Sequence, residues 1–136
     1  MPNMPSLSPI PVPGCVFCDL RVNSDRPVLA RTKSFFAVSD RFPVNVGHTL
    51  LIPDRHVCRL RDLSGEEFAD FKRILEIVQD GLLGRGAEGF NIGINEGEVA
   101  GQTIGHLHIH VIPRYKGDVE SPRGGIRNLK PALVEY

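Results

Sequence analysis

The sequence has no excess of either charge and no long apolar run. Its 16 lysines and arginines balance 16 aspartates and glutamates. A balanced charge produces no overall field toward nucleic acid or an anionic membrane, so neither is an expected partner. Because no stretch approaches the roughly 20 apolar residues that a transmembrane helix needs, a membrane span is excluded.

Cysteine is scarce and odd in number, at positions 15, 18 and 58. Residues 1–13 lack the basic start and apolar core of a secretory signal. Together these features predict a reducing, cytoplasmic location. With 136 residues, 41% of them hydrophobic, the chain is expected to bury one core.

Turn residues divide the chain into three parts. Residues 1–13, rich in proline and serine, predict a flexible or extended lead, and residues 14–115 predict the domain. Residues 116–136, rich in glycine, proline and basic side chains, predict a tail with little regular structure. Within the domain, strands are expected at 26–31, 34–39, 48–52, 90–95 and 106–112, the last one stopped by Pro113.

One helix stands out in the sequence. Ser64 and Glu67 have the spacing of a capping box, and Gly84 marks the end of the helical pattern. The apolar residues between them recur at helical spacing: Phe68, Phe71, Leu75, Val78 and Leu82. Three strands, a helix and two strands predict an α+β fold, an antiparallel sheet with a helix on one face. Phe17, Phe35, Phe36, Phe42 and Ile52 are also expected in the core, or one or two of them in the wall of an apolar cleft. Cys58 is expected to be at least half-buried.

Three of the five histidines, His106, His108 and His110, alternate with single apolar residues. On a strand such a row places the three imidazoles on one face and the apolar residues on the other. Imidazole titrates near neutral pH, acts as a nucleophile and binds metals. A strand that needed only a polar face would more often use threonine, serine, lysine or glutamate, so the row predicts a functional site.

A neutral imidazole can attack phosphorus and form a covalent phosphoramidate. The attack requires that the other ring nitrogen keep its proton against a fixed acceptor, and that donors surround the phosphate. His108, at the centre of the row, is the candidate nucleophile, and His110 is a candidate donor. The loop upstream offers further donors in Gln102 and Thr103, and Asp40 is a candidate partner for ribose hydroxyls.

The stretch GQTIGHLHIHVIPR, residues 101–114, resembles the signature of the histidine triad (HIT) family. The similarity continues in order through residues 95–97, 47–53 and 16–18, and so covers about residues 15–116. The resemblance implies a five-stranded antiparallel sheet with one main helix, usually in a homodimer. It also implies hydrolases or transferases that act on a nucleoside monophosphate through its α-phosphate and need no metal for their chemistry.

By position, the resemblance makes His108 the nucleophile that forms a nucleotidyl-histidine and makes His110 its phosphate-side neighbour. His48 and His106 belong to the histidine network of the family. For His48 the competing interpretation is a buried histidine at the start of a strand.

Four polar residues match binding positions of the family. Asp40 matches its ribose-binding acid, and Asn95, Gln102 and Thr103 match contacts to the phosphate or leaving group. Asp40 could instead cap a turn, and Asn95 could serve only as a turn residue.

Different features point to different branches of the family. The Gln-Thr pair and the Ile-Pro-Arg ending resemble dinucleoside polyphosphate hydrolases, whereas the chain length and the N-terminal cysteines resemble prokaryotic HIT proteins. The substrate classes left open are dinucleoside polyphosphates, nucleoside phosphoramidates and aminoacyl-adenylate-like compounds. Two alternatives to an enzyme also stay open: a nucleotide-binding signalling module with little catalysis, and a binding domain stabilised by zinc. Residues 123–127 would add cations near a polyphosphate or at a dimer contact, or form a solvated tail.

Cys15 and Cys18 form a Cys-x-x-Cys pair, which suits tetrahedral zinc when two further ligands are present. Redox chemistry and plain packing are the competing interpretations. The resemblance supplies the missing ligands, because His56 and His106 match positions where some HIT proteins with this pair hold a structural zinc. Such a closed ligand set would leave His48, His108 and His110 for the phosphate.

Overall fold

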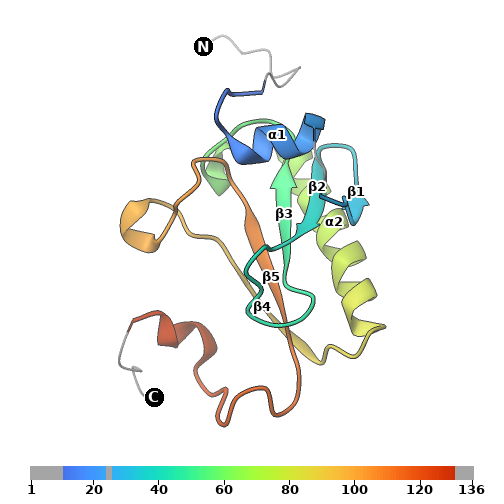
Figure 1. The fold of residues 1–136 in the computed structure, drawn as a ribbon, viewed down its shortest axis with the longest axis vertical. Helices are drawn as coiled ribbons and strands as arrows, with labels where there is room; N and C mark the ends of the chain where they lie inside the picture. The colour runs from blue at the N-terminus through green and yellow to red at the C-terminus, as the bar shows by residue number, and fades with distance from the viewer. Residues whose placement is uncertain (1–10, 24–25, 131–136) are drawn as a thin grey trace.

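Five strands form one antiparallel sheet in the computed structural model, which describes residues 11–23 and 26–130 (Figure 1). The strand order is β1-β2-β3-β5-β4. This architecture confirms the α+β prediction of a five-stranded antiparallel sheet with one main helix. Most of the predicted lead and the last six residues of the tail lie outside the described residues. The strands are β1 (Ala30–Arg31), β2 (Phe35–Ser39), β3 (Thr49–Pro53), β4 (Gly89–Gly93) and β5 (Ile109–Arg114).

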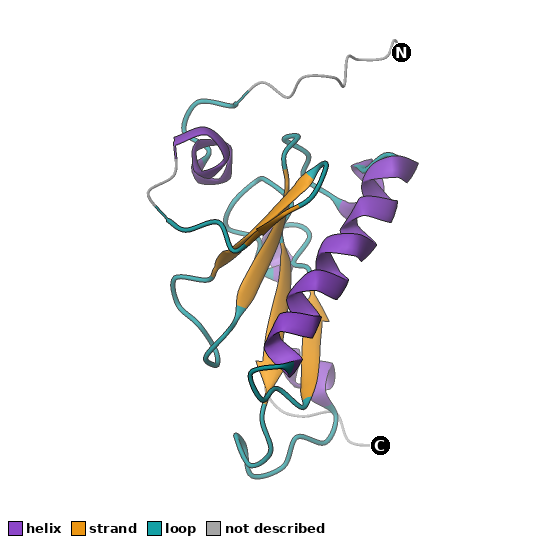
Figure 2. Cartoon of the chain, turned by 90° about the vertical axis from the view of Figure 1, so that its right-hand side faces the viewer, coloured by secondary structure: helices purple, strands orange, loops and turns teal. Residues whose placement is uncertain are grey.

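Two helices lie on opposite sides of the sheet (Figure 2). The long helix α2, Gly65–Leu83, runs along one face, and the short helix α1, Val16–Asn23, lies on the other side. The sequence pattern did not reveal α1. Three short 3-10 helices complete the described chain, and none of its helices has the length and hydropathy of a membrane span. They are η1 (Leu60–Asp62), η2 (Glu98–Ala100) and η3 (Gly125–Leu129).

The central strands are buried on both faces. One face of the sheet packs against α2, where Phe35, Leu51 and Ile74 are inaccessible to solvent. The other face packs against Phe17 and Leu20 of α1. Because both faces are covered, β2 and β3 are continuous apolar runs instead of alternating ones.

The capping box of α2 is confirmed, but its buried stripe is rotated from the predicted one. Ser64 Oγ accepts from the Glu67 N–H at 3.1 Å, and the Ser64 N–H donates back to Glu67 Oε1 at 2.8 Å. Phe68 is 52% exposed, whereas Asp70 is buried and joins α2 to the turn before β2. There its carboxylate accepts a hydrogen bond from the Ser34 N–H at 2.8 Å, and this bond helps to compensate for the burial of the charge.

The histidine row does not lie wholly in a strand, as the sequence pattern had predicted. His106 and His108 precede β5, because the Leu107 N–H donates to the Val57 carbonyl at 2.7 Å instead of to a neighbouring strand. The predicted alternation still holds, since Leu107 lies in the core on the α2 face. Pro113 does not end the strand, and it pairs with Phe90 of β4 inside β5.

Two local predictions about burial were wrong. Phe42, expected in the core, is 85% exposed, because it lies in the loop between β2 and β3, outside the sheet. Cys58, expected to be at least half-buried, is exposed. In the described part of the tail the only regular element is the five-residue η3, in keeping with the little regular structure that its composition predicted.

Gly47, in the turn before β3, is held at a φ of +99°, and a Cβ added there would lie 2.7 Å from Leu82 of α2. We expect Gly47→Ala to lower the free energy of unfolding by about 1–3 kcal/mol, because it combines backbone strain with a steric clash. The matched control is Gly81→Ala within α2, where no atom lies within 4 Å of the added Cβ. That change should raise stability by about 0.5–1 kcal/mol. Urea denaturation of the two variants measures their free energies of unfolding. Equal changes in the two variants would contradict the strain and the steric clash argued for position 47.

Candidate active site

The ring of His108 is fixed by one backbone acceptor and one aromatic neighbour. Its Nδ1 lies 2.9 Å from the carbonyl oxygen of His106. Because a carbonyl can only accept, Nδ1 carries the proton and Nε2 keeps its lone pair. The Phe17 ring packs edge-on against it, with ring centroids 4.9 Å apart, and His108 is only 9% exposed. The neutral ring of His108 therefore has the tautomer and the fixed orientation that a nitrogen nucleophile needs.

A second chain of hydrogen bonds sets the protons of His48 and His110. The Val44 N–H donates to His48 Nδ1 at 3.0 Å, so in the neutral ring the proton is on Nε2. His48 Nε2 lies 2.9 Å from His110 Nδ1 and donates to it. His110 then carries its own proton on Nε2. The network therefore leaves His110 with one N–H that no other histidine uses.

Burial keeps these two histidines neutral. Burial lowers the pKa of His110 to about 4, and the neighbouring His108 and His48 rings act in the same direction. Burial also lowers the pKa of His48, although Asp40 opposes the shift. At neutral pH the pair therefore supplies oriented N–H dipoles instead of full positive charges.

Asp40 lies beside this pair, at the end of β2. Its Oδ1 accepts from the Phe42 N–H at 2.8 Å, which is the turn-capping contact that the sequence left open. Its Oδ2 lies 3.4 Å from His48 Nε2 and 3.8 Å from His110 Nδ1. Asp40 therefore both shapes its turn and faces the histidines, and a ribose-binding role stays a proposal.

The loop between β4 and β5 holds the other predicted contacts. The Gln102 side chain accepts from the Gly97 N–H at 2.9 Å and donates to the Ile104 carbonyl at 3.1 Å, so its amide holds the loop together. Thr103 is exposed on the same loop. Asn95 is half-buried and lines a cavity beside His110.

This cavity has a volume of about 630 Å³. His48, His110 and Asn95 are the predicted site residues that line it, and its other walls come from β4, β5 and the C-terminal segment. His108, Asp40, Gln102 and Thr103 are not part of its lining. The predicted residues thus fall into a buried histidine cluster and a more open cavity that meet at His48 and His110.

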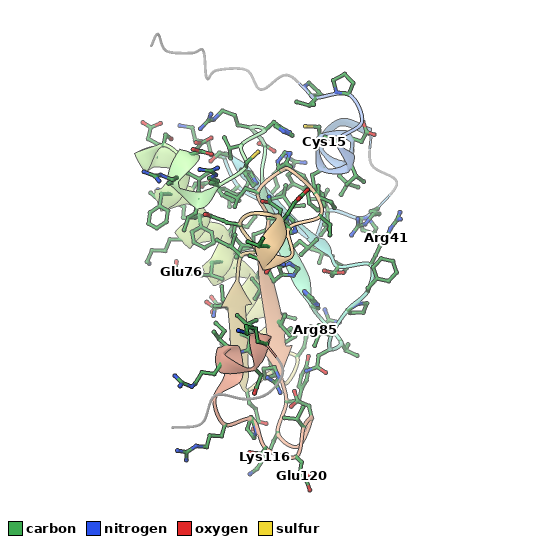
Figure 3. The ribbon with its side chains drawn as sticks, turned by 90° about the vertical axis from the view of Figure 1, so that its left-hand side faces the viewer. Cys15, Arg41, Glu76, Arg85, Lys116 and Glu120 are labelled. Atoms are coloured by element: carbon green, nitrogen blue, oxygen red, sulfur yellow. The ribbon has the colours of Figure 1, made fainter. Side chains whose placement is uncertain are left out.

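The four predicted metal ligands lie together at the other end of the histidine row. The ligand atoms of Cys15, Cys18, His56 and His106 lie within 4.8 Å of one another. Cys15 stands at the start of α1, at the opposite end of the molecule from Lys116 and Glu120 in the turn after β5 (Figure 3). This cluster could hold a metal ion.

The geometry of the cluster fits zinc. Bond lengths of about 2.3 Å to sulfur and 2.0 Å to nitrogen place neighbouring ligand atoms of a tetrahedron about 3.6 Å apart. His106 Nδ1 lies 3.4 Å from Cys15 Sγ and 3.6 Å from Cys18 Sγ, and His56 Nδ1 lies 3.3 Å from Cys18 Sγ. His106 Nε2 lies 2.9 Å from the Pro53 carbonyl, a hydrogen bond that directs the Nδ1 lone pair at the sulfurs.

Asp40, His48 and His110 also converge closely enough to be considered as metal ligands. Hydrogen bonding explains this group better. His48 Nδ1 already accepts from the Val44 N–H, so binding a metal through Nε2 would remove the only proton of the ring. Asp40, His48 and His110 therefore fit a hydrogen-bond network better than a metal site.

The fold and the site together define a small α+β protein with a row of histidines on one face of its sheet. A sequence profile described as the HIT domain matches residues 21–117. The chain therefore belongs to the HIT family.

Three relatives show the range of this family. An uncharacterized HIT-like protein of Methanocaldococcus jannaschii is 36% identical over 118 residues, 85% of this chain and 91% of that protein. The bis(5'-adenosyl)-triphosphatase of Dictyostelium discoideum is 42% identical over 94 residues, 66% of this chain and only 61% of that enzyme. The adenosine 5'-monophosphoramidase of Schizosaccharomyces pombe is 37% identical over 102 residues, 74% of each chain.

A solved structure of similar fold contains zinc. The zinc-bound histidine triad family protein of Mycobacterium smegmatis superposes with a TM-score of 0.68 at 38% identity, over 79% of this chain and 80% of that one.

Sequence reasoning missed several residues that build the site. Phe17 was expected in the core or in an apolar cleft, and its edge-on contacts with the rings of His106 and His108 were not foreseen. Val44 acts through its backbone N–H, which no side-chain pattern reveals. Arg114 and Asp118 form a forked ion pair at the cavity, and their sequence spacing gave no signal because Arg114 ends a strand and Asp118 lies in the turn after it.

We expect His110 to stay neutral well below the ordinary histidine range, with a titration midpoint of about pH 4 instead of 6.5. Since the unfolded chain takes up this proton first, the free energy of unfolding should fall as the pH drops from about 6.5 to 4. The slope is at most about 1.4 kcal/mol per pH unit. NMR titration of the ring protons measures the midpoint, and His110→Asn should lose this part of the slope. A midpoint near 6.5 would contradict the burial that is argued to keep this ring neutral.

Proposed function

We propose that this protein is a nucleotide hydrolase or transferase that cleaves the bond between the α-phosphate of a nucleotide and its leaving group. The observation that carries the proposal is the hydrogen bond from His108 Nδ1 to the His106 carbonyl, which leaves Nε2 free to attack phosphorus. Relatives named as a bis(5'-adenosyl)-triphosphatase and an adenosine 5'-monophosphoramidase support this class of reaction. Two substrate classes, dinucleoside polyphosphates and nucleoside phosphoramidates, follow from these relatives.

In the first step, His108 Nε2 forms a bond to the α-phosphorus while the bond from phosphorus to the leaving atom breaks. The leaving group departs with the bonding electron pair, and an amine leaving group also takes up one proton from solvent. The imidazole becomes a positively charged nucleotidyl-histidine that keeps its Nδ1 proton. The His106 carbonyl stabilises that charge, because it already accepts from Nδ1.

In the second step, water attacks the same phosphorus and the bond to Nε2 breaks. The nucleoside monophosphate leaves, the water releases one proton and the neutral imidazole of His108 is restored. A transferase would accept a different nucleophile here. His110 serves both steps through its Nε2–H, which is directed by the bond from His48 and can donate to a phosphate oxygen.

The remaining predicted residues have supporting roles in this proposal. Asp40 would accept from the ribose hydroxyls through Oδ2, with Oδ1 held by its turn. Asn95 would contact the phosphate or leaving group from the cavity wall. The side-chain contacts of Gln102 support a loop-holding role, which would position the backbone around the exposed Thr103.

A structural zinc at Cys15, Cys18, His56 and His106 is the second part of the proposal. The donor set and its spacing support zinc, as does the zinc-bound relative. Four protein ligands would leave no open position, so the ion would stabilise the fold and take no part in the reaction. Its structural effect would be to hold the start of α1 against the histidine row.

Replacing the nucleophile tests the reaction. We expect His108→Asn to lower kcat by at least about 10³-fold, because no other group can form the covalent intermediate. Rapid quenching with a labelled dinucleotide or phosphoramidate should trap an adduct on the wild-type chain and none on the variant, while AMP affinity changes little. Retained turnover in the variant would refute the mechanism. Wild-type affinity for AMP without an adduct or turnover would favour a binding module.

Replacing a cysteine of the cluster tests the zinc. We expect about one zinc per chain by elemental analysis, and we expect Cys18→Ser to lose it. A lost ligand in a structural site should lower the thermal midpoint by about 10 °C. Cys58→Ser is the matched control, because Cys58 is exposed and lies outside the four-residue cluster. Equal behaviour of the two variants would show that the cluster binds no stabilising ion.

A further inference from the structure

The C-terminal segment, residues 118–130, returns toward the histidine face of the sheet and forms one wall of the cavity described above (Figure 1, red). Val119, Ile126 and Leu129 of this segment line the cavity. Ile92 and Ile112 line it from β4 and β5. The space is therefore apolar on two sides.

The segment is held in place by a fully used ion pair. Arg114 of β5 donates from Nε and Nη2 to the two oxygens of Asp118, both at 2.8 Å, and from Nη1 to Asn91 at 2.7 Å. Asp118 also accepts from the Asn45 side chain at 2.7 Å and from the Tyr115 N–H at 3.0 Å. The hydrogen bonds from Arg114 hold the pKa of Asp118 well below its usual range, so the pair stays charged and closed at working pH.

The cavity is continuous with the reaction site, because His48, His110 and Asn95 line it together with the apolar residues. A leaving group attached to a phosphate at His108 would therefore pass His110 and enter this space. Its volume of about 630 Å³ lies within the range of about 300–1,000 Å³ typical of small-molecule sites.

We propose that this cavity is a leaving-group subsite that selects an uncharged apolar group, attached to the α-phosphate through a short link. The inference rests on the proposed function and adds to it the chemistry of the second half of the substrate. Ile126 and Leu129, 57% and 80% exposed without a ligand, would be covered when such a group binds. Apolar burial of this kind supplies the binding energy.

The charges of the cavity argue against a long polyphosphate in the same place. Its arginine, Arg114, already gives three of its nitrogens to Asp118 and Asn91. Asp118, the one carboxylate of its lining, balances the charge of Arg114, so the ion pair offers no net positive charge to additional phosphates. His48 and His110 are neutral, because burial lowers the pKa of both rings. An apolar amine linked directly to the phosphate meets none of these costs.

The test compares leaving groups of similar reactivity and different size. The substrates are adenosine 5'-phosphoramidates of methylamine and of 2-phenylethylamine, with diadenosine tetraphosphate as the charged comparison. We expect kcat/KM for the phenylethyl compound to exceed that for the methyl compound by about 10- to 100-fold, because its ring buries apolar surface in the cavity. The tetraphosphate should be the poorest of the three.

Wall variants locate the effect. Ile126→Ser and Leu129→Ser should each reduce the ratio of kcat/KM for the phenylethyl compound to kcat/KM for the methyl compound by about fivefold or more. Ile77→Ser is the matched control, since Ile77 is 49% exposed on α2 and does not line the cavity. Because both wall residues are exposed, their replacement should not impair folding, which circular dichroism checks.

The outcomes separate this inference from the proposed function. Turnover of all three substrates without a preference, or a preference that Ile126→Ser leaves intact, overturns the subsite alone. Absence of any turnover that depends on His108 overturns the proposed function. If Ile126→Ser instead slows all substrates equally and changes the sedimentation of the protein, the apolar wall is a contact between copies of the chain and the subsite is wrong.

Discussion

His106 is the residue on which both halves of the site depend. Its side chain faces two cysteine sulfurs through Nδ1 and a backbone carbonyl through Nε2. Its own carbonyl fixes the proton of His108. A rotation of this one residue would therefore disturb the Cys/His cluster and the ring of His108 together. Within the row of three histidines, the first residue therefore orients the ring of the second through its backbone carbonyl.

The histidines at the other end of the row depend on burial. His48 and His110 sit where charging is costly, and the Val44 N–H sets the direction in which their protons point. Neutral rings give a phosphate directed donors without trapping a charged product by a strong ion pair. In the proposed reaction, such an arrangement would suit a site that must release a nucleotide as well as bind it.

The fold was largely readable from the sequence because its signals are local. The Ser64 and Glu67 capping box located α2, and the apolar runs located β2 and β3. The alternation of histidines with apolar residues from His106 onward correctly separated site residues from core residues. It did so even though His110 is the one histidine of the row that lies in a strand. What the sequence hid are features made by distant contacts. Helix α1 is stabilised by packing against the histidine face of the sheet. The burial of Asp70 depends on hydrogen bonds from Thr32 and Ser34. The cavity wall could not be foreseen, because the tail that builds it has the composition of a flexible segment.

The contacts of α1 also bear on how the protein reaches its native state. The sulfur of Cys15 meets a ring 91 positions later in the chain, and that of Cys18 meets one 88 positions later. Pairings of such long sequence separation carry a high loop-closure entropy and form after local structure. We therefore expect α2 and the strands it covers to assemble first, and the histidine face to be closed last. On that order, the proposed zinc would bind late and would set how soon a newly made chain completes its histidine face.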